Sequence, residues 1–301
     1  MMDVFKSLLA APSSVKSLRD LISNPPLGSL LIVEAPGDLS IRAATELATN
    51  LTPLPYQGID VRIARLENER WSLAELEQQV ISPSQLTPAH RCVVVVEDAD
   101  LMDRTAADRL LKVVEEPPNG CLFIFATTDV MRMPVTLRSR ATRVLELDIA
   151  PPADRVSALV EQGVEKSRAA LCVERCGDMW DLTLLASRDD ESFAASAVFD
   201  TSVVQDKAFT AAAEVALALE KVGLLGTSKK NEVAARAATR RACTRLLDVF
   251  AKQLQDALRT TDTNGLDLVS IQKLSYGLDE ARDLLLRYAK VSLVLTRLWT
   301  A

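Results

Sequence analysis

The hydrophobic pattern of the chain is clearest between residues 91 and 147. Two short runs of apolar, mostly β-branched or aromatic residues occupy 93–96 and 122–126. Each run is too short for a helix and lacks polar alternation, which is typical of a strand buried on both faces. Between the two runs, apolar residues recur at helical spacing: Ala106, Leu110, Leu111 and Val114. The order strand, helix, strand predicts part of a parallel α/β sheet.

The helix between these strands carries signals at both ends. Asp103 is a side chain of the type that caps a helix N-terminus by accepting a backbone N–H. Pro117 disfavours helical geometry in the residue before it, so the helix is expected to end there. Upstream, the run 29–33 predicts the first strand, followed by a helix to about Leu51.

Two further elements are expected before this stretch. Residues 60–64 form a candidate strand, because they are short and rich in β-branched residues. Residues 71–80 predict a helix whose inward face holds Leu73, Leu76 and Val80. Trp71 is expected to serve packing.

A boundary follows at Pro151 and Pro152. Short helical patterns continue to about residue 203, and the chain is then rich in alanine and leucine and almost wholly helical. The pattern predicts three domains, which are an α/β core over 1–149, a small helical domain over 150–203 and an all-α domain over 204–301.

Composition narrows the class of protein. Hydrophobic residues make up 48% of the 301 residues and charged residues 25%, which fits a globular protein. No apolar run approaches the roughly 18 residues of a membrane span, and the N-terminus lacks signal-peptide features, so a cytoplasmic protein is expected. The net charge of −6 argues against a generally basic nucleic-acid binder. Five cysteines and one histidine show no metal-ligand spacing, so we expect no metal site.

The residues after the first strand occupy the place of a phosphate loop. A working loop reads Gly-x-x-x-x-Gly-Lys-Ser/Thr, whose amides cradle the phosphates while its lysine and hydroxyl bind the β/γ-phosphates and magnesium. Pro36 and Gly37 are present, but Ser40 stands at the lysine position and Ile41 at the hydroxyl position. We therefore expect this chain to bind neither ATP nor a metal ion.

A family resemblance rests on three motifs. Residues 110–118 read Leu-Leu-Lys-Val-Val-Glu-Glu-Pro-Pro, residues 125–128 read Phe-Ala-Thr-Thr, and residues 137–140 read Leu-Arg-Ser-Arg. Together they resemble the AAA+ module of bacterial DNA polymerase III clamp-loader subunits. The resemblance implies an AAA+ P-loop-type parallel sheet with helices on both faces, then a helical lid and an all-α collar that closes a ring of subunits.

The resemblance also implies roles for single residues. Glu97 and Asp98 occupy, in reversed order, the place of the acids that hold magnesium and orient water, and Thr128 occupies the sensor-1 position. Since the phosphate loop is degenerate, we expect these three to be structural. Ser139 and Arg140 match a loop that enters the ATP site of a neighbouring subunit. Arg140 would there be an arginine finger that stabilises γ-phosphate charge; the alternative is a salt-bridged surface arginine.

The implied function is a loader subunit that is not an enzyme on its own. The turn over 176–181, where active members carry a sensor-2 arginine, has none. The implied partners are gamma/tau and delta subunits, the sliding clamp and primer–template DNA, with ATP and magnesium in the neighbouring subunit. Arg104 either faces that DNA or is solvated. Two alternatives stay open: an ATP-hydrolysing gamma/tau-type subunit, and a non-catalytic AAA+ scaffold outside replication.

Overall fold

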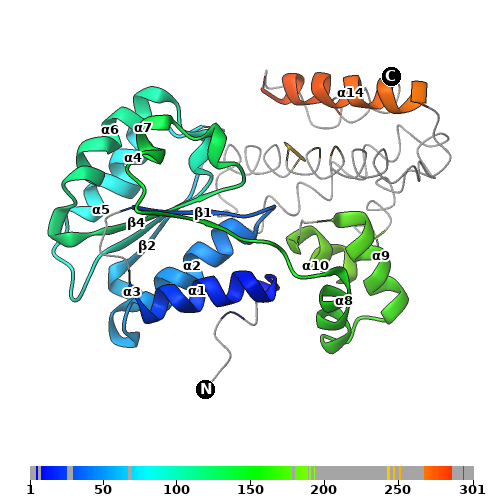
Figure 1. Cartoon of the computed structure of the whole chain (residues 1–301), viewed down its shortest axis with the longest axis horizontal. Coiled ribbons are helices and arrows are strands. Elements are labelled where there is room, and N and C mark those ends of the chain that lie inside the picture. Colours follow the sequence, from blue (N-terminus) through cyan, green and yellow to red (C-terminus); the bar gives the residue numbers. More distant parts are fainter. Residues whose placement is uncertain are drawn as a thin grey trace. The chain divides into compact units, whose positions relative to one another are not determined.

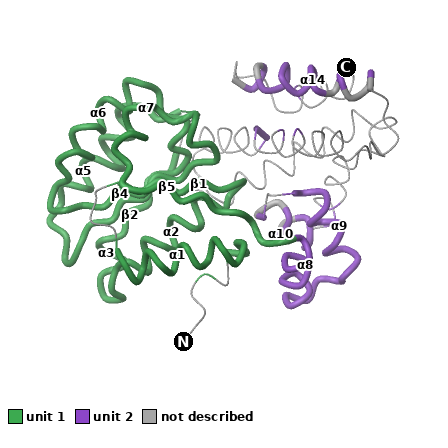
Figure 2. The backbone as a smooth tube through the Cα atoms, viewed as in Figure 1, with its two compact units in different colours: residues 1–151 green, residues 152–301 purple. Residues whose placement is uncertain are grey.

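The structure, a computed structural model, covers most of the first half of the chain. It describes residues 5, 8–25, 30–66, 70–177, 180–188, 190, 193, 243–244, 247, 251, 268–286 and 294. The chain divides into two compact units, Met1–Pro151 and Pro152–Ala301 (Figure 2). Among the described residues, no helix is long and apolar enough to cross a membrane.

A five-stranded parallel sheet forms the centre of the first unit (Figure 1). The strands lie in the order β2-β3-β4-β1-β5. Their bounds are β1 Leu30–Glu34, β2 Val61–Ala64, β3 Val93–Val96, β4 Leu122–Thr127 and β5 Arg143–Glu146. Every strand pair is parallel, so the carboxyl ends of all five strands lie at one edge of the sheet. The predicted parallel α/β sheet is confirmed.

Helices cover both faces of this sheet (Figure 1). Alternate strand residues point to opposite faces, so Val94 and Val96 pack with α4, α6 and α7, whereas Val93 and Val95 pack with α1 and α2. The helix bounds are α1 Pro12–Ser23, α2 Leu39–Leu51, α3 Gln57–Asp60, α4 Leu73–Leu76, α5 Ser82–Ser84, α6 Arg104–Glu115 and α7 Val135–Arg138. Shorter helical turns are η2 Leu54–Tyr56, η3 Glu77–Ile81, η4 Ala99–Leu101, η5 Pro118–Gly120 and η6 Val130–Arg132.

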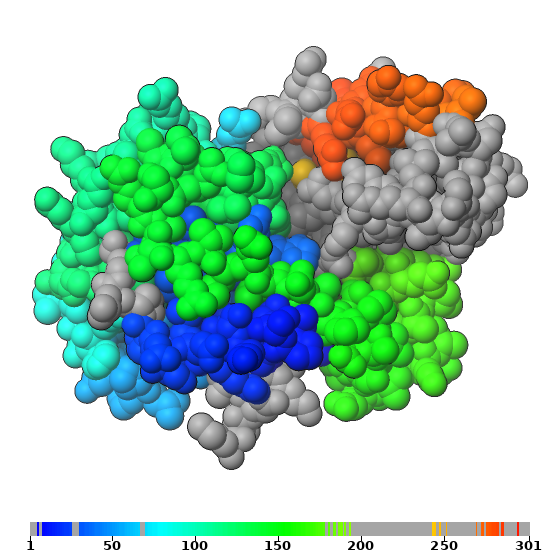
Figure 3. Space-filling view, in the orientation of Figure 1, coloured from blue at the N-terminus to red at the C-terminus, as the bar shows by residue number. Residues whose placement is uncertain are grey.

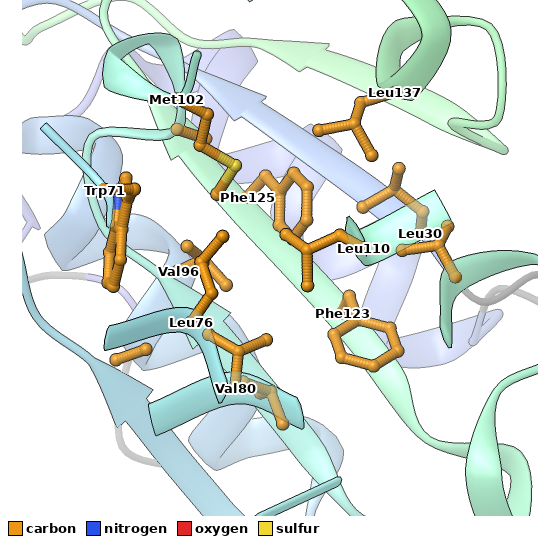
Figure 4. Packing of buried hydrophobic residues seen from close by; sticks show 14 of the residues in the cluster. Leu30, Trp71, Leu76, Val80, Val96, Met102, Leu110, Phe123, Phe125 and Leu137 are labelled. Atoms are coloured by element: carbon orange, nitrogen blue, oxygen red, sulfur yellow. The ribbon is translucent and has the colours of Figure 1, made fainter. Parts of the chain in front are cut away.

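The core on the α6 face is closely filled (Figure 4). Phe123 and Phe125 of β4 pack in the same cluster as Leu110 of α6, and all three side chains are buried. Trp71 lies at the edge of this cluster and is only 1% exposed, which confirms its packing role. Burying a side chain of this size stabilises the fold by roughly 1.5–3 kcal/mol.

Helix α6 begins and ends close to where the sequence predicts. The Asp103 carboxylate caps it by accepting the N–H of Ala106 at 2.7 Å, and its last residue is Glu115, two positions before Pro117. Twelve residues at 1.5 Å each make it about 18 Å long. Because α6 connects the end of β3 to the start of β4, it runs from the carboxyl edge of the sheet back to the amino edge.

The helix predicted over 71–80 differs from the structure. Ser72 and Glu75 form a capping box, so α4 begins at Leu73, which is 48% exposed. The segment η3 is π-helical, which rotates the following side chains relative to a regular α-helix. The inward face therefore holds Leu76 and Val80, as predicted, but the inward placement of Leu73 was wrong.

Asp60 belongs to α3 rather than to the strand predicted over 60–64. Its carboxylate accepts the backbone N–H groups of Ala89, His90 and Arg91 at 2.9, 2.6 and 3.1 Å. Burial raises the pKa of Asp60, but these hydrogen bonds outweigh that effect and hold the pKa below its ordinary value. One side chain thereby fixes the chain ahead of β3 next to the start of β2.

The N-terminal helix is tied to the chain that leaves β5. The Ser14 hydroxyl accepts the N–H of Asp148 at 2.8 Å, and the N–H of Ala11 donates to the carbonyl of Asp148 at 2.8 Å. Figure 3 shows α1 (blue) on the surface beside a green segment of the chain. These bonds hold the last residues of the unit against its first helix.

The described part of the second unit is helical. Its elements are α8 Pro152–Glu161, α9 Lys166–Cys176, α10 Trp180–Arg188 and α14 Leu268–Leu286. Helices α8 to α10 lie within the domain predicted over 150–203, and the buried Arg155 donates to the carbonyl of Gly177. The domain predicted over 204–301 falls mostly outside the described residues, so that prediction stays untested.

The contacts of Asp60 predict a loss of stability for Asp60→Asn. The amide side chain keeps one acceptor oxygen but loses the charge-assisted hydrogen bonds, so the free energy of unfolding should fall by about 1–3 kcal/mol. Urea unfolding at neutral pH measures this loss. The control is Asp20→Asn, because Asp20 is an exposed aspartate of α1. Equal effects of the two substitutions would contradict the role of Asp60.

Candidate functional site

The connection between β1 and α2 is short. Only residues 35–38 separate the end of β1 from the start of α2. The N–H of Ala35 donates to the carbonyl of Thr127 at 3.1 Å, and Gly37 turns the chain at a φ of 58°. A phosphate loop has four residues between its first glycine and its Gly-Lys pair. With Ser40 at the lysine position, these four are residues 35–38, so the length is kept while Glu34 and Leu39 stand at the two glycine positions.

The residues at the expected lysine and magnesium positions face the protein. Ser40 is 1% exposed, and Ile41 packs against the core cluster on the α1 and α2 face of the sheet. Arg42 lies further along α2 and forms an ion pair with Asp38, with 3.7 Å between Nη1 and Oδ2. None of the three presents a free cation or hydroxyl to a nucleotide at the helix N-terminus.

A carboxylate of the chain itself lies at the N-terminus of α2. Asp38 is the N-cap residue and is only 7% exposed. The N-terminus of a helix carries partial positive charge and is where phosphate groups bind in nucleotide sites. Asp38 places a negative charge there, so a phosphate group would meet repulsion in addition to the loss of the lysine.

Further acids surround the carboxyl edge of the sheet. Burial raises the pKa of Glu34 at the end of β1, and the negative charges of Asp129, Glu146 and Asp100 add to the rise, although a hydrogen bond from the Val130 amide at 2.8 Å opposes it. Within the described part of the chain, no group of three or more His, Cys, Asp or Glu side chains is placed to hold a metal ion. These acids concentrate negative charge at the carboxyl edge of the sheet.

Glu97 and Asp98 follow β3 and are engaged in the fold. The Glu97 carboxylate accepts the N–H of Leu66 at 3.3 Å, and its carbonyl accepts Nε1–H of Trp71 at 2.9 Å. Asp98 is buried and adopts a left-handed backbone with a φ of 45°, a conformation that aspartate tolerates better than most residues. Both acids thus help to shape the turn that leads into α6.

The structure brings out a threonine and an acid that the sequence motifs did not single out. Thr127, the last residue of β4, is buried and donates its hydroxyl to Asp100 at 2.8 Å. Thr128, the predicted sensor-1 residue, lies one position past the strand and is partly exposed. Burial raises the pKa of Asp100, and the charge of Asp98 adds to this rise. Strand alternation, counted from Phe125, could have identified the inward threonine.

Ser139 and Arg140 form a turn directly after α7. The Ser139 hydroxyl donates to the carbonyl of Thr136 at 2.9 Å and accepts Nη1–H of Arg140 at 3.0 Å. Nε and Nη2 of Arg140 both lie 2.7 Å from Oε1 of Glu115. The Arg140 side chain remains 43% exposed, so the guanidinium is oriented but accessible.

Arg140 and the carboxyl ends of the strands lie at opposite edges of the sheet. Glu115 is the last residue of α6, and Arg143 opens β5, so both mark the amino edge. Glu97 and Asp98 lie at the carboxyl edge, about 18 Å away along α6. The structure therefore does not bring the predicted finger together with the predicted nucleotide residues.

Two other arginines of this region have different surroundings. Nη1 of Arg138 lies 2.8 Å from Sδ of Met131. Arg104, at the start of α6, is 93% exposed and lies 4.0 Å from Asp108. Neither is held as Arg140 is, on two sides by an acid and a hydroxyl.

Comparison with known proteins identifies relatives of part of the chain. Residues 60–149 match the family described as DNA polymerase III, delta subunit. The chain is 44% identical over 48 residues to the DNA polymerase III subunit gamma of Buchnera aphidicola from Schizaphis graminum, which is 16% of this chain and 13% of that protein. It is 30% identical over 86 residues to the Escherichia coli subunit tau, which is 28% of this chain and 13% of that protein.

The chain thus spans about an eighth of the length of these relatives. Among solved structures, a DNA polymerase III gamma subunit-related protein of Thermotoga maritima has 18% identity and a TM-score of 0.49, with 95% of this chain and 97% of that chain covered. The Thermotoga maritima RuvB Holliday junction branch migration motor has 15% identity and a TM-score of 0.42, with 82% of each chain covered. The matched segment, residues 60–149, is related to DNA polymerase III subunits, so the resemblance seen in the motifs is confirmed there.

The missing lysine and hydroxyl, together with Asp38, predict that the isolated chain binds no ATP. Isothermal titration calorimetry with magnesium and ATP up to about 1 mM should show no saturable heat of binding. A dissociation constant of about 1 mM corresponds to a binding free energy of roughly −4 kcal/mol. A gamma/tau-type subunit with an intact phosphate loop serves as the positive control. Saturable, magnesium-dependent binding to the isolated chain would contradict the prediction.

The environment of Asp100 predicts that Asp100→Asn stabilises the protein near neutral pH. The amide keeps the oxygen that accepts from Thr127 but removes a buried charge, so the gain should exceed the roughly 0.5 kcal/mol of surface substitutions. A raised pKa in the folded state lowers stability as the pH rises through the unfolded and then the folded value. The gain should therefore vanish below about pH 3.9, the pKa of an unfolded aspartate.

Urea unfolding of the two proteins at several pH values measures this difference. Asp148→Asn is the control because Asp148 is exposed. A gain that is independent of pH, or absent, would show that the Asp100 charge does not weaken the fold.

Proposed function

We propose that this chain is a subunit of a DNA polymerase III-type clamp loader that does not hydrolyse ATP and that presents Arg140 to the ATP site of a neighbouring subunit. In this role it resembles delta-prime. Its partners are gamma/tau-type and delta-type subunits, the sliding clamp and primer–template DNA. ATP and magnesium are bound by the neighbour, and the assembly places the clamp on primed DNA in the cytoplasm.

The observation that carries the proposal is the position of Arg140. It is exposed, it is held outward by Glu115 and Ser139, and it lies at the amino edge of the sheet. An arginine at that edge is about the length of α6 away from Glu97 and Asp98. An arginine finger at this position can contact a nucleotide only if the nucleotide is bound by a neighbouring subunit that packs against this edge.

The β1–α2 connection supports the other half of the proposal. Nucleotide binding there is opposed by the buried Ser40, which stands at the lysine position, and by the Asp38 carboxylate. An active ATPase subunit needs a lysine and a hydroxyl at these positions. The relatives named gamma and tau favour the alternative of an ATP-hydrolysing subunit, and binding of ATP to the isolated chain would revive it.

The proposal predicts a loss of ATP turnover when Arg140 is removed from the assembled complex. The complex is reconstituted from the gamma/tau-type, delta-type and clamp proteins of the same genome with this chain, and is assayed with primed DNA. Arginine fingers supplied in trans contribute about 10³–10⁵ in rate in well-studied NTPases. The other ATP sites of the complex receive their arginine fingers from other subunits, and Arg140→Ala leaves those fingers in place. We therefore expect Arg140→Ala to lower the total ATP turnover by tenfold or more only if the ATP sites act together.

A single-site readout removes this dependence on the other interfaces. Pre-steady-state turnover resolves the slow fraction of sites that face this chain, and that fraction should lose at least about a hundredfold in rate. Arg143→Ala is the matched control, because Arg143 is an exposed arginine three residues away. Gel filtration checks that both variants assemble. Full turnover by an intact Arg140→Ala complex would overturn the proposed role.

A further inference from the structure

We infer that Glu115 is a positioning residue for Arg140, holding its guanidinium in the orientation in which it meets the neighbour's nucleotide. The inference rests on the proposed function. It concerns a residue at the end of a different helix, 25 positions earlier in the chain.

The contact between the two side chains fixes the guanidinium on one side. Nε of Arg140 donates to Oε1 of Glu115 at 2.7 Å, Nη2 lies 2.7 Å from the same oxygen, and Nη1 donates to the Ser139 hydroxyl at 3.0 Å. A guanidinium has five N–H donors in one plane. Each terminal nitrogen carries two N–H groups, so each keeps at least one for a further acceptor, and two such groups side by side match two oxygens of a phosphate.

The Ser139 hydroxyl is itself oriented. It donates its proton to the Thr136 carbonyl at 2.9 Å, so a lone pair is left to accept from Arg140. The guanidinium is therefore held from α6 on one side and from the α7 turn on the other. An arginine side chain otherwise has many rotamers, and fixing them in advance avoids that entropy loss when the phosphate is met.

The negative charge of Glu115 lies where it does not favour the stability of α6. Glu115 and Glu116 are adjacent at the C-terminus of α6, where the helix dipole disfavours negative charge. Arg140 offsets the charge of Glu115, whereas the Glu116 side chain has no hydrogen bond or ion pair among those found in the described part of the chain. Both glutamates are exposed, so Glu116 is a matched control for Glu115.

The ion pair between Glu115 and Arg140 is too weak to inhibit the neighbour's reaction by withholding Arg140. An exposed ion pair shifts an equilibrium by roughly fivefold at most, which is too little to keep a finger from a phosphate that binds it more strongly. Orientation of the side chain needs no more than this small preference. Loss of the Glu115 charge should therefore slow ATP turnover by the neighbour rather than speed it up.

The test compares Glu115→Gln, Glu116→Gln, Arg140→Ala and the double variant Glu115→Gln/Arg140→Ala in the reconstituted complex with ATP, clamp and primed DNA. Single-site turnover at the interface with this chain is measured against ATP concentration. Glu115→Gln should lower kcat by roughly three- to fivefold, in line with the small preference of an exposed ion pair, and leave KM for ATP within about twofold. Glu116→Gln should behave as the unchanged protein. The thermal midpoint of the isolated chain should be the same for both glutamine variants.

The double variant decides how Glu115 acts. If it acts through Arg140, adding Glu115→Gln to Arg140→Ala has no further effect. Equal turnover for the two glutamine variants, an additive loss in the double variant, or faster turnover with Glu115→Gln would each overturn the inference while leaving the role of Arg140 intact. Full turnover with Arg140→Ala would instead overturn the proposed function, and the role of Glu115 with it.

Discussion

Parallel strands need a helix to carry the chain back between them, and this constraint organises the first unit. Helix α6 leaves the carboxyl edge of the sheet after β3 and ends at the amino edge before β4. The acids after β3 and the pair of Glu115 and Arg140 are thereby separated by the length of one helix. The strands hold this separation firmly, because β3 and β4 are buried along their whole length on both faces. One sheet thus presents two chemically different edges.

The two edges differ in charge and in exposure. At the carboxyl edge, Asp38 is buried and Asp100 is partly buried, and burial together with the charge of Asp98 raises the pKa of Asp100. At the amino edge, Arg140 is exposed and has an acid on only one side. Charged groups that face solvent at low cost can be offered to another protein, whereas buried acids mainly shape the fold. The residues that resemble catalytic acids therefore lie on the less accessible edge.

Local patterns were enough to predict the elements but not their long-range contacts. The run 93–96, the cap at Asp103 and the stop at Pro117 are each encoded within a few residues, and the structure has them as predicted. Leu73 was misplaced because a capping box and a π-helical turn changed the helical phase. These features depend on particular side chains rather than on hydrophobic period.

The site was predicted to a different extent. The family resemblance singled out Ser139, Arg140 and the degenerate loop, since these are short signatures, and their roles stay predictions. The partners of these residues were not visible, because Glu115 precedes Arg140 by 25 positions and Asp100 precedes Thr127 by 27. Such pairs become neighbours only when the order of strands is known. No hydrophobic period encodes them.

The connection between β1 and α2 keeps the length of a phosphate loop but not its residues. Counting back from Ser40 at the lysine position, Glu34 and Leu39 stand where the two glycines would be, and Ile41 stands where the hydroxyl would be. Leu39 and Ser40 are each only 1% exposed, so a lysine at position 40 would have to displace packed side chains. Restoring a phosphate loop would therefore take several substitutions together with repacking at the start of α2, and no single substitution would achieve it.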